Sequence, residues 1–132
     1  MLKIEYMSEA LTDGIRVHVH NRYLPEHSNP IASRWLFGYQ VVISNESEVP
    51  VRLVTRHWII TDANGDVEEV EGVGVVGETP IIEPGETYRY SSFCPLKTPF
   101  GTMHGSYGMV RNGQTFQADV ATFNLASPNS VN

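Results

Sequence analysis

Apolar and polar residues alternate along several stretches of the chain, which is the pattern of β-strands with one buried face. From residue 15 the apolar positions Ile15, Val17 and Val19 alternate with the polar positions Arg16, His18, His20 and Arg22. A longer stretch, from about residue 34 to 44, places aromatic and β-branched side chains on one face: Trp35, Phe37, Tyr39, Val41 and Ile43. Such residues are enriched in strands, so both stretches are predicted to be strands.

The same pattern predicts further strands over residues 51–61, 67–71, 87–93, 102–111 and 114–124. Between them lie turn signals, of which Asn64-Gly65, Pro84-Gly85 and Asn112-Gly113 are the clearest, because glycine readily takes the positive φ that tight turns need. Residues 1–13 are expected to be a loosely ordered lead-in, and residues 94–101 a loop.

About seven strands with no helical period predict an all-β protein. An antiparallel β-sandwich of the fibronectin type III or immunoglobulin-like type fits best, and the lack of a cysteine pair favours the fibronectin type. A small barrel is the alternative, because strand spacing does not separate the two. The length of 132 residues suits a single domain over 1–132, with an ordered core over about 14–125.

Charge narrows the range of partners. The formal net charge is −6, and one window without Lys, Arg or His carries Asp62, Asp66, Glu68, Glu69, Glu71, Glu78, Glu83 and Glu86. Nonspecific nucleic-acid binding needs clustered basic residues, so we expect no nucleic-acid partner. No apolar run is long enough for a membrane span, and the first residues lack a secretory core, so we expect no membrane partner and a cytoplasmic location. The single cysteine, Cys94, agrees with that location.

The stretch Gly72-Val73-Gly74-Val75-Val76-Gly77 has the G-x-G-x-x-G spacing of dinucleotide sites. In such sites the glycines lead from a strand into a helix whose N-terminus faces the pyrophosphate. Here Pro80 follows closely and carboxylates flank the glycines. We therefore expect a glycine-shaped crossover between strands, with Val73, Val75 and Val76 as protein-binding candidates. The alternative is a site for a phosphorylated small molecule (pyrophosphate or nucleotide) or a divalent metal at Gly72, Gly74 and Gly77.

Other candidate chemistry is sparse. His18 and His20 share a strand face and form an alternative metal pair, which would need a third ligand from elsewhere. Alternation places His57 on the face of Val51 and Leu53, where it is expected to be partly buried and hydrogen-bonded. No nucleophile stands in a recognisable context beside a base, so we predict no catalytic residues, no enzyme activity and no cofactor.

An ordered set of motifs resembles the ApaG family. It comprises Arg56-His57-Trp58, then Gly72-x-Gly74-Val75-Val76-Gly77-x-x-Pro80, then Pro84-Gly85, Tyr88-x-Tyr90 and Leu96-x-Thr98-Pro99-x-Gly101-x-Met103-x-Gly105-x-Tyr107-x-Met109. The resemblance spans roughly residues 15–125. The chain departs from the family pattern at Thr79, at Ser91-Ser92-Phe93-Cys94 and at Val120-Ala121.

The resemblance implies a fibronectin III-like sandwich in a bacterial cytoplasmic protein without an established enzyme activity. Similar domains fused into F-box and polymerase-interacting proteins imply protein binding, and bacterial members imply a genetic link to cobalt resistance and magnesium efflux. We therefore expect a non-enzymatic module that binds another protein or, as a homodimer, a second copy of itself.

Overall fold

The computed structural model describes residues 5–128, which form nine strands and two short 3-10 turns. The strands are β1 (Glu5–Thr12), β2 (Ile15–Tyr23), β3 (Trp35–Asn45), β4 (Val51–Asp62), β5 (Val67–Val73), β6 (Ile81–Ile82), β7 (Thr87–Leu96), β8 (Phe100–Arg111) and β9 (Gln114–Ala126). The turns η1 (Pro25–His27) and η2 (Pro30–Ala32) lie between β2 and β3. Within the described range, no helix is long and apolar enough to cross a membrane.

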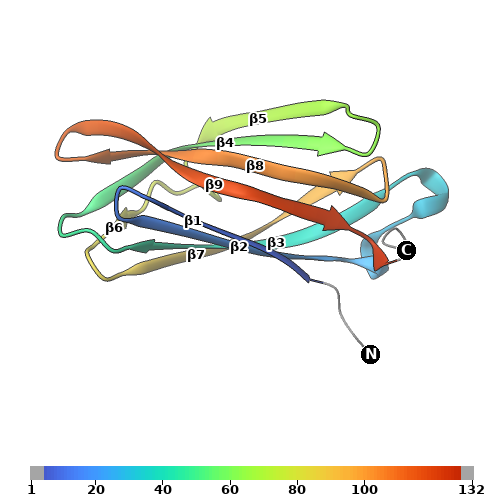
Figure 1. Cartoon of the computed structure of the whole chain (residues 1–132), viewed down its shortest axis with the longest axis horizontal. Coiled ribbons are helices and arrows are strands. Elements are labelled where there is room, and N and C mark those ends of the chain that lie inside the picture. The colour runs from blue at the N-terminus through green and yellow to red at the C-terminus, as the bar shows by residue number, and fades with distance from the viewer. Residues whose placement is uncertain (1–4, 129–132) are drawn as a thin grey trace.

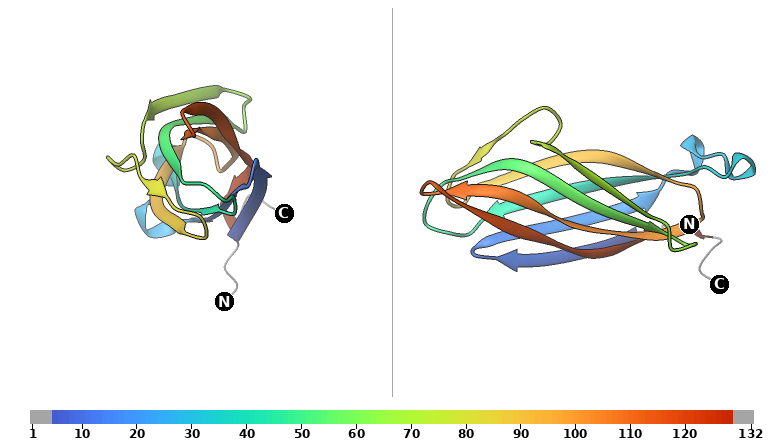
Figure 2. Two further views of the ribbon diagram at one scale, coloured as in Figure 1. Left: turned by 90° about the vertical axis from the view of Figure 1, so that its left-hand side faces the viewer. Right: turned by 90° about the horizontal axis from the view of Figure 1, so that it is seen from above.

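The strands form two antiparallel sheets that pack face to face (Figures 1 and 2). The first sheet has the order β1-β2-β3-β7, and the second has the order β5-β4-β8-β9, with β6 also paired to β4. Two packed antiparallel sheets are the architecture shared by immunoglobulin-like and fibronectin type III domains. The predicted all-β sandwich is therefore confirmed, and the chain forms two sheets rather than the alternative small barrel.

Two strands were not predicted. Residues 5–12, expected to be a lead-in, form β1 and pair with β2 along their whole length. β1 gives a weak sequence signal because its apolar residues Met7 and Leu11 point to solvent. The second is β6, which has only two residues and pairs with Val51 and Arg52 of β4.

The predicted loop over residues 94–101 was also partly wrong, because β7 continues to Leu96 and β8 begins at Phe100. Pro95 does not end β7, and it pairs with Leu36 of β3. Proline lacks an amide hydrogen, but an edge strand such as β7 tolerates it because its outer amides need no partner strand.

Aromatic side chains hold the centre of the core. Trp58 of β4 meets Tyr39 of the opposite sheet edge-on, with ring centroids 5.5 Å apart. Tyr107 and Phe123 also pack edge-on against Trp58, each at 6.0 Å. Edge-to-face contacts of this kind are favourable beyond the area that they bury, so Trp58 joins the two sheets at the middle of the sandwich.

Hydrogen bonds close one side of the sandwich, where β9 of the second sheet runs beside β1 and β2 of the first. The Asp119 amide donates to the Thr12 hydroxyl at 3.1 Å, and the Asn21 side-chain amide donates to the Asn124 carbonyl at 3.0 Å. On the other side, β5 and β7 are each the last strand of their sheet. The sandwich thus has one bridged side and one side with free strand edges.

Candidate functional site

The glycine stretch forms a tight hairpin between β5 and β6. Val75 and Glu78 exchange two backbone hydrogen bonds, with N···O distances of 2.8 and 2.9 Å. Between them Val76 and Gly77 have φ angles of +48° and +78°. Two successive positive φ angles are typical of the two-residue turn that matches the twist of hairpins. The stretch is therefore a glycine-shaped link between strands, as the flanking prolines predicted.

Gly74 sets the start of this hairpin. Its φ angle is +68°, and a Cβ at this position would collide with the carbonyl oxygen of Glu78. Its amide donates to the Val54 carbonyl at 2.6 Å, which fastens the hairpin to β4. Because the amides of Gly74, Val75 and Glu78 all donate to carbonyls of the chain itself, they do not converge on an outside anion.

Arg56 lies across the glycine stretch from β4. Its guanidinium donates to the carbonyls of Val73 and Gly74 at 3.2 and 2.9 Å. A Cβ at Gly72 would come within 2.7 Å of the guanidinium carbon, so glycine makes room for this side chain. The Arg56 guanidinium thus stabilises the hairpin. Binding of a phosphate or metal at Gly72, Gly74 and Gly77 stays a prediction.

The three valines of the stretch have two different environments. Val75 is fully buried in the core, whereas Val73 and Val76 are 73% and 67% exposed. Ile81 of β6, which the sequence analysis missed, is also half-exposed. Val75 anchors the hairpin from inside, and Val73, Val76 and Ile81 are the apolar side chains of this region that a partner could contact.

A bulge in β4 places His57 on the outer face, contrary to the expectation from alternation. The side chain is partly buried, as expected, but its Nε2 atom has no hydrogen-bond partner among the described residues. The pairing with β8 shifts between Leu53 and Thr55. After this shift Trp58 continues the buried face that Val51 and Leu53 begin. Period-two patterns reverse face at an inserted residue, and the sequence carries no sign of this insertion.

His57 and β5 border a groove on the outer face of the second sheet. Its volume is about 670 Å³, and it is lined by Thr55, Arg56, His57, Glu71, Gly72, Ser106 and Gln117. The His57 Nε2 atom lies 3.5 Å from Glu71 and 3.8 Å from Glu69. The groove therefore combines carboxylate, amide and hydroxyl oxygens next to the free edge of β5.

The buried thiol and phenols are unsuited to nucleophilic chemistry. Burial raises the pKa of the Cys94 thiol to about 12, so it stays protonated at neutral pH. Burial also raises the pKa values of Tyr90 and Tyr107, whose hydroxyls hydrogen-bond to each other between the sheets. These groups contribute to the core as neutral side chains.

The histidine pair His18 and His20 lies on the outer face of the first sheet, as the alternation predicted. Their neighbours on β3 are Val42 and Gln40, which offer no strong metal ligand. On β1 the neighbour of His18 is Glu9, whose carboxylate is already paired with Arg16. Among residues 5–128, no three His, Cys, Asp or Glu side chains are grouped to hold a metal ion. Metal binding by this pair thus gains no third ligand within the described chain.

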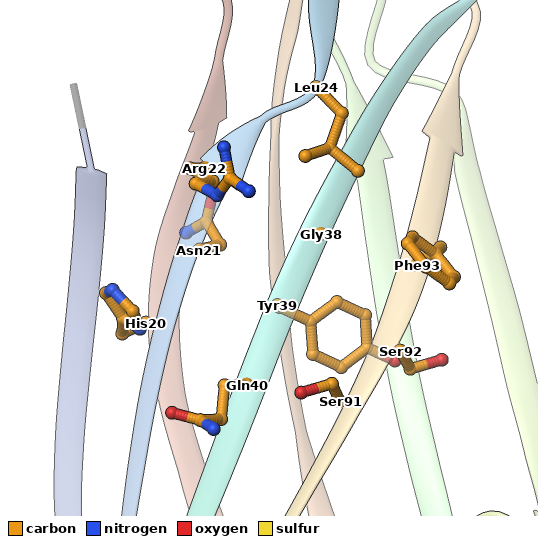
Figure 3. Close-up of a pocket in the computed structure, with 10 residues that line it drawn as sticks. All are labelled: His20, Asn21, Arg22, Leu24, Gly38, Tyr39, Gln40, Ser91, Ser92 and Phe93. Atoms are coloured by element: carbon orange, nitrogen blue, oxygen red, sulfur yellow. The ribbon is translucent and has the colours of Figure 1, made fainter. Parts of the chain in front are cut away.

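A hollow of about 200 Å³ lies beside this pair, on strands β2, β3 and β7 (Figure 3). Arg22, Gly38 and Phe93 occupy one row across the three strands, and His20, Gln40 and Ser91 occupy the next row. Sequence analysis missed this site because it depends on the pairing of three strands. One signal was present: Phe93 falls out of phase with Tyr88 and Tyr90, so it points to solvent.

Carboxylates are concentrated on one strand. β5 of the second sheet carries Glu68, Glu69 and Glu71, whereas the first sheet carries Arg16, His18, His20, Arg22 and Arg89 together with Glu9, which pairs with Arg16. Figure 1 shows β5 at the top of the molecule and the first sheet at the bottom. The acidic window is therefore a local surface feature rather than a general property of the protein.

Comparison with known proteins finds close relatives over nearly the whole chain. The model of the ApaG domain matches residues 25–111. A protein named ApaG from Anaeromyxobacter dehalogenans is 54% identical over 96% of this chain and 100% of its own length. Another from Sinorhizobium fredii is 53% identical, over 95% of this chain and 97% of its own length. Neither name states an enzymatic activity.

Solved structures that are similar to this chain in sequence also share its fold. An X-ray structure of a structural-genomics target is 50% identical, with a TM-score of 0.83 over 90% of this chain and 91% of that one. A crystal structure of a protein named ApaA from Bordetella pertussis is 48% identical, with a TM-score of 0.84 over 86% of this chain and 94% of that one. Sequence and fold thus agree on one set of relatives.

Proposed function

This chain belongs to the ApaG family, and we propose that it is a non-enzymatic module that binds an extended, basic segment of another protein along β5. The observation that carries the proposal is the combination of a free strand edge with exposed apolar residues at its end. Within residues 5–128, β4 is the one strand that pairs with β5, and Val73 and Val76 are exposed where β5 enters the hairpin. Strand addition to such an edge is a common mode of peptide recognition.

The carboxylates of β5 determine which segment fits. Like charges directly opposite each other destabilise a strand pair, so Glu69 and Glu71 disfavour pairing with an acidic strand or with β5 of a second copy. Lysine or arginine side chains would meet these carboxylates instead. The neighbouring groove offers oxygen acceptors at Glu71, Ser106 and Gln117, and the Arg56 guanidinium that also lines it is held by the carbonyls of Val73 and Gly74.

The absence of activated groups supports the non-enzymatic part of the proposal. The Cys94 thiol is buried and its pKa is raised to about 12. His57 lies near carboxylates, and its neighbour on β8 is Ser106. Both residues stand on the open outer face of the sheet rather than in an enclosed pocket. We further propose that partner binding by this module underlies the link to cobalt resistance and magnesium efflux that the family resemblance implies.

The test uses two labelled peptides of about nine residues, a length typical of long strands. One alternates lysine with valine, and the other alternates glutamate with valine. Fluorescence anisotropy with the full chain should show binding of the lysine peptide that weakens with salt, and no binding of the glutamate peptide. Equal binding of both peptides, or binding of neither, would overturn the proposal.

Two variants locate the contact. The double variant Glu69→Lys/Glu71→Lys should lose the lysine peptide and bind the glutamate peptide instead. The matched control is Glu48→Lys, which reverses an exposed charge in the turn between β3 and β4, and it should bind as the unaltered chain does. The lysines of the double variant are opposite in charge to the glutamates of the unaltered chain. If β5 can pair with β5 of a second copy, a mixture of the two chains should form a dimer in size-exclusion chromatography.

A further inference from the structure

We propose that the hollow over Gly38, on the outer face of the first sheet, binds a small planar aromatic anion. In this arrangement the ring of the ligand stacks on Phe93 above Gly38, and its carboxylate or phosphate pairs with Arg22. The site lies on the sheet opposite to β5 and is independent of the proposed protein-binding edge. It therefore adds a ligand class to the protein rather than a second contact for the same partner.

Gly38 provides the space. Arg22, Gly38 and Phe93 pair directly across β2, β3 and β7, so the Cα atoms of the two outer residues are about 10 Å apart. A stacked ring needs about 3.5–4 Å from the Phe93 ring. Any side chain on the middle strand would fill this width, and glycine leaves it open. At one end Leu24 closes the hollow, since a Cβ on Gly38 would lie 3.3 Å from the Leu24 Cδ1 atom.

Phe93 provides the stacking surface. Its side chain is 64% exposed, although the other outward residues of β7 near it are Ser91 and Pro95. Figure 3 shows Phe93 across Gly38 from the strand that carries Arg22. An exposed phenylalanine offers the face of its ring, and pairs of aromatic rings attract each other in offset-stacked arrangements. A planar ligand would bury this ring without any change in the backbone.

Arg22 provides the charge. Arg16, six residues before it on the same face of β2, is paired with Glu9 and Glu46, at 3.0 and 2.6 Å. Within residues 7–128 no carboxylate forms an ion pair with Arg22, whose partner in the β1–β2 register is Glu5. The guanidinium fork matches carboxylate and phosphate groups and can bind either through two parallel hydrogen bonds. The carboxylates of Glu68, Glu69 and Glu71 lie on β5 of the other sheet.

Gln40 and Ser91 line the part of the hollow next to Gly38. They occupy the adjacent row with His20 and line the same hollow. Their amide and hydroxyl groups can donate and accept hydrogen bonds along the edge of a ligand ring. A volume of about 200 Å³ accommodates one or two fused rings with a single anionic group. An aromatic carboxylate and the base and phosphate of a mononucleotide share this chemistry.

The test is a titration of the isotope-labelled full chain with benzoate and, separately, with adenosine monophosphate, followed by amide chemical shifts. We expect shifts at Arg22, Gly38 and Phe93 with at least one probe at millimolar concentration, and the stronger probe identifies the source of the ligand. Cyclohexanecarboxylate keeps the charge but lacks a planar ring, and benzyl alcohol keeps the ring but lacks the charge. Both should bind more weakly than benzoate if benzoate is the responding probe.

Matched variants separate this site from general surface effects. Arg22→Gln should weaken binding of the responding probe about tenfold, and Phe93→Leu about threefold or more. Arg89→Gln removes a charge from the same face, and Phe100→Leu removes an exposed ring elsewhere; neither should change the affinity. The proposal is overturned if neither probe shifts these amides, if cyclohexanecarboxylate binds as well as benzoate, or if the control variants weaken binding as much.

Discussion

The hydroxyl of Tyr90 on β7 hydrogen-bonds the hydroxyl of Tyr107 on β8, which joins the edge strand of the first sheet to an inner strand of the second. Tyr107 is fully buried, so its hydroxyl has no access to water when its partner is removed. A buried polar group that loses its partner destabilises a protein more than the bond itself contributes. This pair therefore makes a sharp test of the packing between the sheets.

Replacing Tyr90 with phenylalanine should lower the free energy of unfolding by about 1–3 kcal/mol. The double variant Tyr90→Phe/Tyr107→Phe removes both polar groups and should cost less than the sum of the two single changes. Urea denaturation of all four chains completes the cycle. Tyr88→Phe is the control, because the Tyr88 hydroxyl makes only a long, exposed contact of 3.5 Å with Glu78. Strictly additive single changes would contradict the direct bond.

Stability should fall as the pH rises above about 9. Burial raises the pKa of the Cys94 thiol from 9.0 to about 12, so above pH 9 the unfolded chain loses a proton that the folded chain keeps. Deprotonation then favours the unfolded state, with a slope of about 1.4 kcal/mol per pH unit for one group. Tyr90 and Tyr107, whose pKa values burial also raises, add to the slope above pH 10.

The variant Cys94→Ala isolates the thiol in this profile. Its stability at neutral pH will differ from that of the unaltered chain, but the informative quantity is the slope. From pH 9 up to about pH 12 the variant should show a flatter decline, because over this range the thiol keeps its proton only in the folded chain, and only above that range should the two curves run parallel. Urea midpoints measured at closely spaced pH values provide the comparison. Equal slopes across the whole range would show that Cys94 titrates alike in both states.

Val76 is an unfavourable residue at its position. A β-branched side chain at a φ of +48° is strained, whereas asparagine tolerates this conformation and is preferred there before glycine in such turns. Val76→Asn should therefore stabilise the fold by about 1 kcal/mol. The same change at Val73, which is exposed but has no positive φ, should not stabilise it. A lower melting temperature for Val76→Asn would contradict the turn geometry.

The effects of substituting Gly72 and Arg56 on the free energy of unfolding should not be additive. A methyl group at Gly72 would displace the Arg56 guanidinium from the carbonyls of Val73 and Gly74. Gly72→Ala and Arg56→Gln are each expected to destabilise the fold by about 1–2 kcal/mol, and the double variant by little more than one of them. Hydrogen exchange of the Gly74 amide, which is bonded to Val54, should accelerate in all three variants.

The strands and turns were largely predictable from sequence because their signals are local. Alternation identified β2 and β3 nearly to the residue, and Asn112-Gly113 forms the expected turn with positive φ at both positions. Strand β1 escaped because its apolar residues face solvent and its inward positions, such as Ser8 and Ala10, are small. A strand without an apolar inner face carries no periodic signal.

The candidate sites were harder to predict because they depend on contacts between distant segments. The bulge near Leu53 turns His57 outward, and nothing in the local sequence marks it. The burial of Val75 between two exposed valines follows from a hairpin folding back onto the core. The hollow over Gly38 requires the register of β2, β3 and β7 together, which alternation within one strand does not contain.

The row of carboxylates on β5 gives this edge of the molecule a local negative charge. A charged partner would rotate the molecule into the correct orientation before the two surfaces touch, which accelerates association more than it slows dissociation. At physiological ionic strength this steering extends over about 8 Å. The carboxylates of β5 therefore orient a basic partner only over the last few ångström of its approach.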